Sequence, residues 1–281
     1  MTARRVSRRV AGGAKRSRMH DGKPSWQDPE LPQQYKQGWV EFYKLKFKVT
    51  PDVLIPRPET ELLVDEVLDF VNNLHPKPYS LTILDLGTGS GNIAISLAKN
   101  LSRSDKLCLS HPITRFGYAP GVTILATDIS RKALKVAKQN AKLHGVEKQI
   151  TFIQSNLLGT KNTQWRKNGP PDVIVTNLPY IPSARIPYLD SSVKDFEPKI
   201  ALNGGRDGFE LYRKLFAQIK KLGWHPALMV FEIDYTHGEL AINEAQKYFP
   251  KARIEVKTDL SHKQRILLIK ATGWEAPEEL P

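Results

Sequence analysis

The sequence predicts an α/β fold with a mostly parallel sheet, and two patterns lead to that prediction. Short apolar runs alternate with amphipathic stretches between residues 81 and 249, which is typical of buried strands joined by crossover helices. Two further apolar segments, residues 253–257 and 264–270, are separated by only six residues. So short a connection indicates an antiparallel pair that closes the sheet.

The segment before this alternation is expected to form smaller elements. Residues 34–38 predict a turn, and residues 42–49 predict an alternating strand in a hairpin or at a sheet edge. Two prolines in residues 53–58 exclude a helix there, and Glu59 and Thr60 then begin a helix that ends near Phe70. We therefore expect a basic tail (1–30), a lead-in segment (31–78), a main domain (79–272) and a C-terminal tail (273–281).

Within the main domain, each strand is expected to be followed by a helix. A helix after Asn92 follows the first strand, and Ser130 caps the helix after the second. The polar residues 102–120 are expected to form a surface insertion. Further helices are expected at residues 208–222 and 238–249, and the strands at residues 81–85, 122–128, 150–154, 172–176 and 227–233.

The net charge of +13 is concentrated at the N-terminus. Seven basic residues precede the first acidic residue, Asp21, so the tail supplies about half of the excess. By composition this tail is disordered, and it would contact RNA, act as an organelle transit peptide or remain solvated. No apolar run approaches the roughly 20 residues that cross a bilayer, and the single Cys108 indicates no disulfide framework.

Three groups of residues stand where parallel strands end, the edge at which open α/β sheets hold ligands. Residues 87–91, Gly-Thr-Gly-Ser-Gly, form a loop whose backbone can approach a ligand closely, and Asp128 can accept hydrogen bonds from ribose hydroxyls. Residues 177–180, Asn-Leu-Pro-Tyr, offer an amide and an aromatic face that suit a planar nitrogen substrate, although a simple turn has the same composition.

These residues carry a family resemblance. Residues 85–91, Asp128 and residues 177–180 resemble the signature motifs of class I S-adenosylmethionine-dependent methyltransferases that methylate planar amino nitrogens. Further segments are similar to the peptide chain release factor glutamine N(5)-methyltransferases: residues 34–35, Gly38, Phe42, 53–61, 196–198, 201–208 and 259–265. The resemblance spans residues 34–270 and implies a Rossmann-like methyltransferase domain at residues 79–272.

The resemblance also implies roles for individual residues. Asn177, Pro179 and Tyr180 would be catalytic: the Asn177 oxygen and the Leu178 carbonyl accept the two amide hydrogens of a glutamine, and Tyr180 packs on the amide plane. The substrate is the Gly-Gly-Gln glutamine of a class I release factor, bound by Asn177, Leu178, Pro179 and Tyr180. The cofactor is S-adenosylmethionine, bound by Asp85, Gly87, Thr88, Gly89, Ser90, Gly91, Asp128, Asn156, Leu157 and Asn177.

The chain departs from the family pattern at three points. Leu178 replaces the first of two usual prolines, a form known from ribosomal RNA adenine dimethyltransferases, and Asn156 stands where a carboxylate is common. The family's helical N-terminal domain, which helps to hold the release factor, is reduced to about 30 residues. Two alternatives therefore stay open: an adenine-N(6) methyltransferase acting on RNA or DNA, and a non-catalytic RNA-binding relative that uses the basic tail.

Other polar residues have plainer interpretations. Glu59 and Thr60 either close the cofactor pocket or cap a helix, Glu197 and Arg206 favour local salt bridges, and Glu232 is expected to be a hydrogen-bonded structural acid. The scattered histidines predict no metal site. We expect a monomer without membrane contact in the bacterial cytoplasm, with a mitochondrial location as the alternative.

Overall fold

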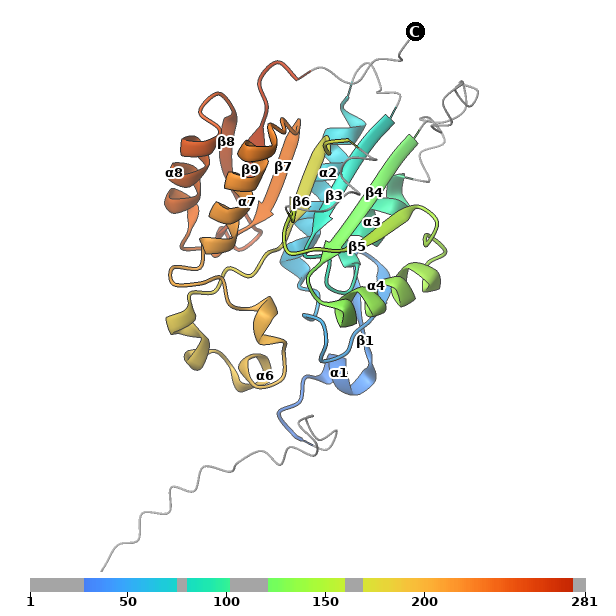
Figure 1. Cartoon of the computed structure of the whole chain (residues 1–281). Coiled ribbons are helices and arrows are strands. Elements are labelled where there is room, and N and C mark those ends of the chain that lie inside the picture. Colours follow the sequence, from blue (N-terminus) through green and yellow to red (C-terminus); the bar gives the residue numbers. More distant parts are fainter. Residues whose placement is uncertain (1–27, 75–79, 102–120, 160–168, 275–281) are drawn as a thin grey trace, which may run out of the picture.

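The computed structural model describes residues 28–74, 80–101, 121–159 and 169–274. Its centre is a seven-stranded sheet with the order β5-β4-β3-β6-β7-β9-β8, in which β9 runs antiparallel to both of its neighbours (Figure 1). The strands are β3 (Ser80–Leu86), β4 (Gly121–Asp128), β5 (Ile150–Gln154), β6 (Val173–Thr176), β7 (Leu228–Glu232), β8 (Arg253–Thr258) and β9 (Gln264–Lys270). The predicted parallel sheet with an antiparallel end is confirmed.

Helices cover both faces of the sheet. One face packs against α2 (Glu61–Asn72), α3 (Asn92–Leu101) and α4 (Arg131–Leu143), and the other against α7 (Glu210–Leu222) and α8 (Gly238–Tyr248). The strands are therefore buried on both sides, which explains why they appear in the sequence as continuous apolar runs. Alternate residues of one strand serve the two cores: Ile83 belongs to the first cluster and Leu84 to the second.

The lead-in helix is part of this core. Leu63, Val64, Val67 and Val71 of α2 are buried in the same cluster as the strands β3, β6 and β7. The helix begins as expected after the proline-rich segment, with the short helix η1 (Pro58–Thr60) ahead of it. The packing fixes η1 beside the carboxyl end of β7.

One prediction for the N-terminal segment is wrong and another is confirmed. The expected turn at residues 34–38 is a short helix, α1 (Gln33–Gln37), which ends at Gly38 in the left-handed conformation. The expected hairpin is present and is formed by β1 (Trp39–Phe42) and β2 (Leu45–Lys48), so it begins earlier than the predicted residues 42–49. Tyr43 and Lys44 both have positive φ, 51° and 59°, and so form a two-residue turn without the usual Asn or Gly.

The carboxyl ends of the parallel strands all point toward the smaller elements (Figure 1). There α1 and the hairpin lie on one side, and η2 (Ser183–Tyr188), α6 (Ser191–Lys194) and η3 (Lys199–Ala201) lie on the other. This is the edge at which ligands bind in open α/β sheets. No helix among the described residues is long and apolar enough to cross a membrane.

Several predictions fall outside the described residues. They are the basic tail to residue 27, the end of the lead-in segment at residues 75–78, the insertion at residues 102–120 and the last residues, 275–281. The proposed domain boundaries stay predictions.

Candidate functional site

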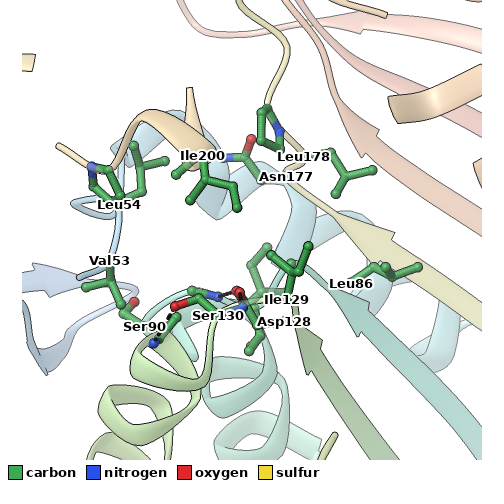
Figure 2. A pocket seen from close by; sticks show the side chains of 18 of the residues that line it. Val53, Leu54, Leu86, Ser90, Asp128, Ile129, Ser130, Asn177, Leu178 and Ile200 are labelled. Carbon is green, nitrogen blue, oxygen red and sulfur yellow. Dashed lines mark hydrogen bonds between the residues drawn. The ribbon is translucent and has the colours of Figure 1, made fainter. Parts of the chain in front are cut away.

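A cleft with an empty volume of about 1070 Å³ opens at the carboxyl ends of β3, β4 and β6. Figure 2 shows Asn177, Leu178 and Ile200 on one side of it, and Ser90, Asp128 and Ser130 on the opposite side. The sequence separates these residues by as many as 110 positions, and the parallel topology brings them together. Such a concave edge, open to solvent at its mouth, is where a small ligand would bind.

The glycine loop between β3 and α3 forms one wall. Gly87 and Gly89 have φ values of 73° and 55°, a conformation that favours glycine. A Cβ atom at Gly89 would meet only the Gly87 carbonyl oxygen, at 4.0 Å, so the space above the loop is open to a ligand. Thr88, Ser90 and the loop glycines at 87 and 89 line the cleft.

Asp85 and Gly91 lie under the loop and not on the cleft wall. The Asp85 carboxylate is fully buried, and its Oδ2 accepts hydrogen bonds from the Thr88 hydroxyl (2.6 Å) and the Ala94 amide (3.1 Å). Burial raises the pKa of Asp85 to about 7. A Cβ at Gly91 would lie 3.2 Å from the Cβ of Ala137, so this glycine allows the loop to pack on α4. Both residues therefore shape the loop.

Asp128, at the end of β4, faces the cleft. Its Oδ2 accepts a hydrogen bond from the Gly89 amide (2.9 Å), and its Oδ1 accepts one from the Ser130 amide (2.8 Å). Each carboxylate oxygen can accept a further hydrogen bond, which suits a pair of ribose hydroxyls. Burial raises the pKa of Asp128 above its ordinary value, with these amide donors opposing the shift.

Asn156 and Leu157 follow β5 and line the same cleft. Leu157 has a φ of 51°, which is unusual for a residue with a branched side chain, and its side chain is buried. Such strain occurs where the surrounding structure holds a residue in place, often at a ligand site. The end of β5 therefore adds an amide side chain and a constrained backbone to the wall.

The Asn-Leu-Pro-Tyr segment forms the opposite wall. Asn177, Leu178 and Pro179 line the cleft, and the Leu178 side chain packs toward the glycine loop, 3.4 Å from the position of a Cβ at Gly87. The Tyr212 hydroxyl lies 3.2 Å from the Leu178 carbonyl oxygen and also donates to the Glu232 backbone carbonyl. Because one proton serves both acceptors, the Leu178 carbonyl keeps acceptor capacity.

Tyr180 does not line the cleft, although the three residues before it do. The Tyr180 hydroxyl donates to Oε1 of Glu232 at 2.9 Å, and burial together with the nearby carboxylate raises the pKa of Tyr180 well above its ordinary value. The tyrosine is thus held as a neutral phenol.

Thr60 and Glu232 extend this constellation. Oε2 of Glu232 accepts a hydrogen bond from the Thr60 hydroxyl (2.6 Å), and the Thr60 oxygen accepts one from Nδ2 of Asn177 (3.0 Å). Thr60 lines the cleft and makes no helix-capping hydrogen bond, so the capping alternative is wrong. The sequence did not indicate these hydrogen-bond partners of Glu232. The one feature that could have indicated its role is a single acidic residue at the end of an apolar strand.

A backbone brace holds the Asn-Leu-Pro-Tyr segment from behind. The Ile181 amide donates to the Leu202 carbonyl (3.1 Å), and the Gly204 amide donates to the Ile181 carbonyl (2.9 Å). A Cβ at Gly204 would lie 2.7 Å from both the Pro179 carbonyl oxygen and the Tyr180 Cα. Residue 204 must therefore be glycine, because its backbone packs closely on the backbone of Pro179 and Tyr180.

An ion pair ties the lead-in segment to the region after the motif. Arg57 pairs with Glu197, which also accepts a hydrogen bond from the Ile55 amide at 3.2 Å. The predicted salt bridge of Glu197 exists, but its partner is distant in sequence and not local. Arg206 is exposed. Apolar side chains that sequence reasoning did not assign, among them Leu54, Ile129 and Ile200, complete the cleft.

The lining fits the predicted cofactor. The open glycine loop matches the amino-acid part of the cofactor, and the Asp128 carboxylate, with its free acceptor positions, matches the ribose. The apolar walls match the adenine ring. Among the described residues, no group of three or more His, Cys, Asp and Glu side chains is arranged to hold a metal ion.

Comparison with solved structures gives the same class of fold. The human Mettl16 catalytic domain, solved in complex with an RNA hairpin, aligns with a TM-score of 0.61 at 14% identity, covering 84% of this chain and 79% of that chain. Human methyltransferase 10 domain containing protein aligns with a TM-score of 0.53 at 13% identity, covering 81% and 89%. A profile described as a methyltransferase domain matches residues 79–224. The fold and the cleft thus define a class I methyltransferase.

Sequence relatives narrow this class. The release factor glutamine methyltransferase of Bacillus cereus is 36% identical over 240 residues, which cover 84% of this chain and 75% of the relative. Those of Moorella thermoacetica and Bacillus subtilis are 36% and 34% identical, and each covers 84% of this chain and 74% of the relative. The chain belongs to the release factor glutamine methyltransferase family.

Proposed function

We propose that this chain methylates the side-chain amide nitrogen of the glutamine in the Gly-Gly-Gln motif of a class I peptide chain release factor, using S-adenosylmethionine. Family membership supports the substrate. The observation that carries the chemistry is the position of Asn177, which lies across the cleft from the glycine loop and Asp128 (Figure 2). A methyl donor on one wall would meet an amide held on the other.

S-adenosylmethionine, when bound, supplies an electrophilic methyl group. Gly87, Gly89 and Asp128 would hold it through backbone and carboxylate contacts, with Asp85 and Gly91 maintaining the loop from beneath. Asn156 and Leu157 would border the adenine. These assignments rest on the free acceptor positions of Asp128 and on the open space above the loop.

The wall that would hold the substrate glutamine needs hydrogen-bond acceptors more than it needs a general base. A glutamine amide nitrogen is a weak nucleophile and does not lose a proton near neutral pH, so a general base would contribute little before methyl transfer. The Asn177 Oδ1 and the Leu178 carbonyl oxygen would each accept one amide hydrogen and so aim the nitrogen. Prepaid orientation of this kind lowers a barrier by roughly 7–11 kcal/mol at best.

Pro179 and Tyr180 would complete the acceptor site. Pro179 has a fixed φ and no N–H, so it presents the preceding carbonyl without a competing donor. The Tyr180 ring would pack on the amide plane while its hydroxyl is anchored to Glu232. The proton released after transfer can pass to water.

The adenine-methylating alternative depends on Leu178. Its side chain is buried and packs toward the glycine loop. The part of Leu178 that an acceptor would contact is the backbone carbonyl, which is the same whether residue 178 is leucine or proline. The substitution therefore favours neither substrate.

The test is transfer of labelled methyl from S-adenosylmethionine to purified release factor, with bulk RNA as the competing acceptor. We expect label on the Gly-Gly-Gln glutamine, located by peptide mapping. A release factor with alanine in place of that glutamine is the matched control and should stay unlabelled. Labelled RNA beside unlabelled release factor would reject the proposal.

The partner proposals follow from this function. The release factor is the protein partner, the basic tail would add contacts to RNA on a ribosome-bound substrate, and the enzyme would act as a monomer in a bacterial cytoplasm. Sedimentation of the chain alone and with release factor measures the stoichiometry directly.

A further inference from the structure

We propose that Thr60 and Glu232 are positioning residues that fix which end of the Asn177 amide faces the acceptor. This inference rests on the proposed function, because it concerns the oxygen that accepts a substrate amide hydrogen. Thr60 belongs to η1 and Glu232 to the end of β7, so two elements outside the Asn-Leu-Pro-Tyr segment would control its chemistry.

Sheet register places Asn177 and Glu232 side by side. Strands β6 and β7 are parallel neighbours in which Thr176 pairs with Phe231, so Asn177, just past the end of β6, lies beside Glu232, the last residue of β7. The Thr60 hydroxyl stands between the two side chains, 2.6 Å from Oε2 of Glu232 and 3.0 Å from Nδ2 of Asn177. The three groups form a continuous hydrogen-bonded chain.

Counting hydrogens determines the direction of this chain. A carboxylate has no proton to give, so the one hydroxyl proton of Thr60 must lie between Thr60 and Glu232. The Thr60 oxygen is then left as an acceptor, and only the NH2 group of Asn177 can satisfy it. The amide is planar, so Oδ1 must point the other way. A reversed amide would place two oxygens against each other without a hydrogen between them.

The deep burial of the Glu232 carboxylate indicates that an acidic residue is kept at this position for a functional reason. Glu232 is 1% exposed and Thr60 is 2% exposed, yet Glu232 takes part in none of the ion pairs found among the described residues. Hydroxyl donors from Thr60 and Tyr180 hold its two oxygens instead. A buried carboxylate with no cation in contact costs stability, and the charge of Arg265 opposes the rise of its pKa without forming an ion pair with Glu232. A neutral side chain would satisfy a purely structural role.

The other carboxylate oxygen of Glu232, Oε1, positions a second side chain of the proposed acceptor site. By accepting from the Tyr180 hydroxyl, the carboxylate anchors the aromatic end of the segment while Thr60 orients its amide end. One buried charge thus sets both side chains that the proposed acceptor site uses. Replacing Glu232 with glutamine would supply an NH2 group toward one of these oxygens and permit the reversed chain.

The first experiment compares Thr60→Val with Thr60→Ser. Valine keeps the shape and removes the hydroxyl, so we expect kcat to fall about 10- to 100-fold while the cofactor Kd and the release-factor KM change less than about threefold. Serine restores the hydroxyl and should keep kcat within about threefold of wild type. Thr127→Val is the matched control, because the Thr127 hydroxyl is buried and has no hydrogen-bond partner among the described residues. Its kcat should not change.

A double-mutant cycle separates positioning from a general packing effect. In an Asn177→Ala background there is no amide to orient, so adding Thr60→Val should not slow turnover further. Wild-type kcat in Thr60→Val, or the same fold loss in both backgrounds, would overturn the inference. If Thr60→Val does not fold, Glu232→Gln replaces it in the cycle with the same expectations.

Failure of the proposed function can be recognised separately. A wild-type chain that methylates no release factor rejects that function alone, and NMR of chain labelled with ¹⁵N-asparagine then decides the positioning. The Asn177 NH2 protons should exchange with water more slowly in wild type than in Thr60→Val. Equal exchange rates would overturn the inference whatever the substrate.

Discussion

The guanidinium of Arg57 and the carboxylate of Glu197 form an ion pair across 140 residues of sequence. Glu197 is almost wholly buried, and burial raises its pKa while Arg57 opposes that shift. The pair joins the segment ahead of α2 to the segment that follows the Asn-Leu-Pro-Tyr residues. Arg57 also lines the cleft, so the ion pair links the cleft wall to the segment after the motif.

Removing only the cation should destabilise the protein strongly. Arg57→Met leaves the Glu197 carboxylate buried with the Ile55 amide as its remaining donor, and we expect the free energy of unfolding to fall by about 3–5 kcal/mol. The double variant Arg57→Met/Glu197→Gln removes the charge as well and should recover most of that loss. Urea denaturation measures both. Equal stability of the single and double variants would contradict this account.

Gly204→Ala should disable the acceptor wall. The new methyl group would lie within 2.7 Å of the Pro179 carbonyl and the Tyr180 Cα, so the segment must shift. We expect turnover to fall by at least about tenfold. Gly145→Ala is the control for replacing a glycine without a clash, because Gly145 has open space around it; its φ of 66° favours glycine. That variant should lose about 1–2 kcal/mol of stability without loss of kcat.

Asp85 should make stability fall as pH rises. Its pKa of about 7 in the folded protein exceeds the 3.8 of an unperturbed aspartate, so the folded state binds the proton more tightly. Its contribution is full below pH 3.8 and is lost as pH rises to about 7. Relative to Asp85→Asn, wild type should therefore lose about 2–3 kcal/mol between pH 5 and 8, measured by urea denaturation. A constant difference between the two proteins would contradict the raised pKa.

The sequence predicts the central sheet well because both faces of parallel strands are buried. Strand β6, for example, has four buried residues in a row, and no other local structure explains so short an apolar run between turns. The hairpin is predictable, but the position of its turn is not, because Tyr43 and Lys44 adopt left-handed conformations that nothing in their side chains signals. Packing of Phe42 and Phe47 on the core imposes that turn.

The strand-end residues were predictable for the same topological reason, whereas their mutual support was not. Asp128 and Asn177 follow strands, and parallel strands end at one edge. The hydrogen bond from Thr60 to Glu232 joins residues 172 positions apart, and no local pattern encodes it. It depends on how α2 packs across the sheet.

Asn177→Ala should separate methyl transfer from cofactor binding. The side chain lines the cleft on the acceptor side, so we expect kcat to fall by at least about a hundredfold while cofactor affinity changes less than about threefold. Calorimetric titration with S-adenosylmethionine and single-turnover methylation measure the two effects. Equal losses in both would mean that Asn177 serves the cofactor.

Turnover should also fall in mild acid because of Glu232. Burial raises the pKa of this carboxyl above its ordinary value, Thr60, Tyr180 and Arg265 oppose the shift, and Glu59 adds to it. Once protonated, Glu232 can donate to the Thr60 oxygen, which frees the Thr60 proton for Asn177 and permits the reversed amide. We therefore expect kcat to rise with pH through an inflection above the usual carboxyl range. The Glu232→Gln variant should lack that inflection, and an unchanged profile in this variant would assign it to another group.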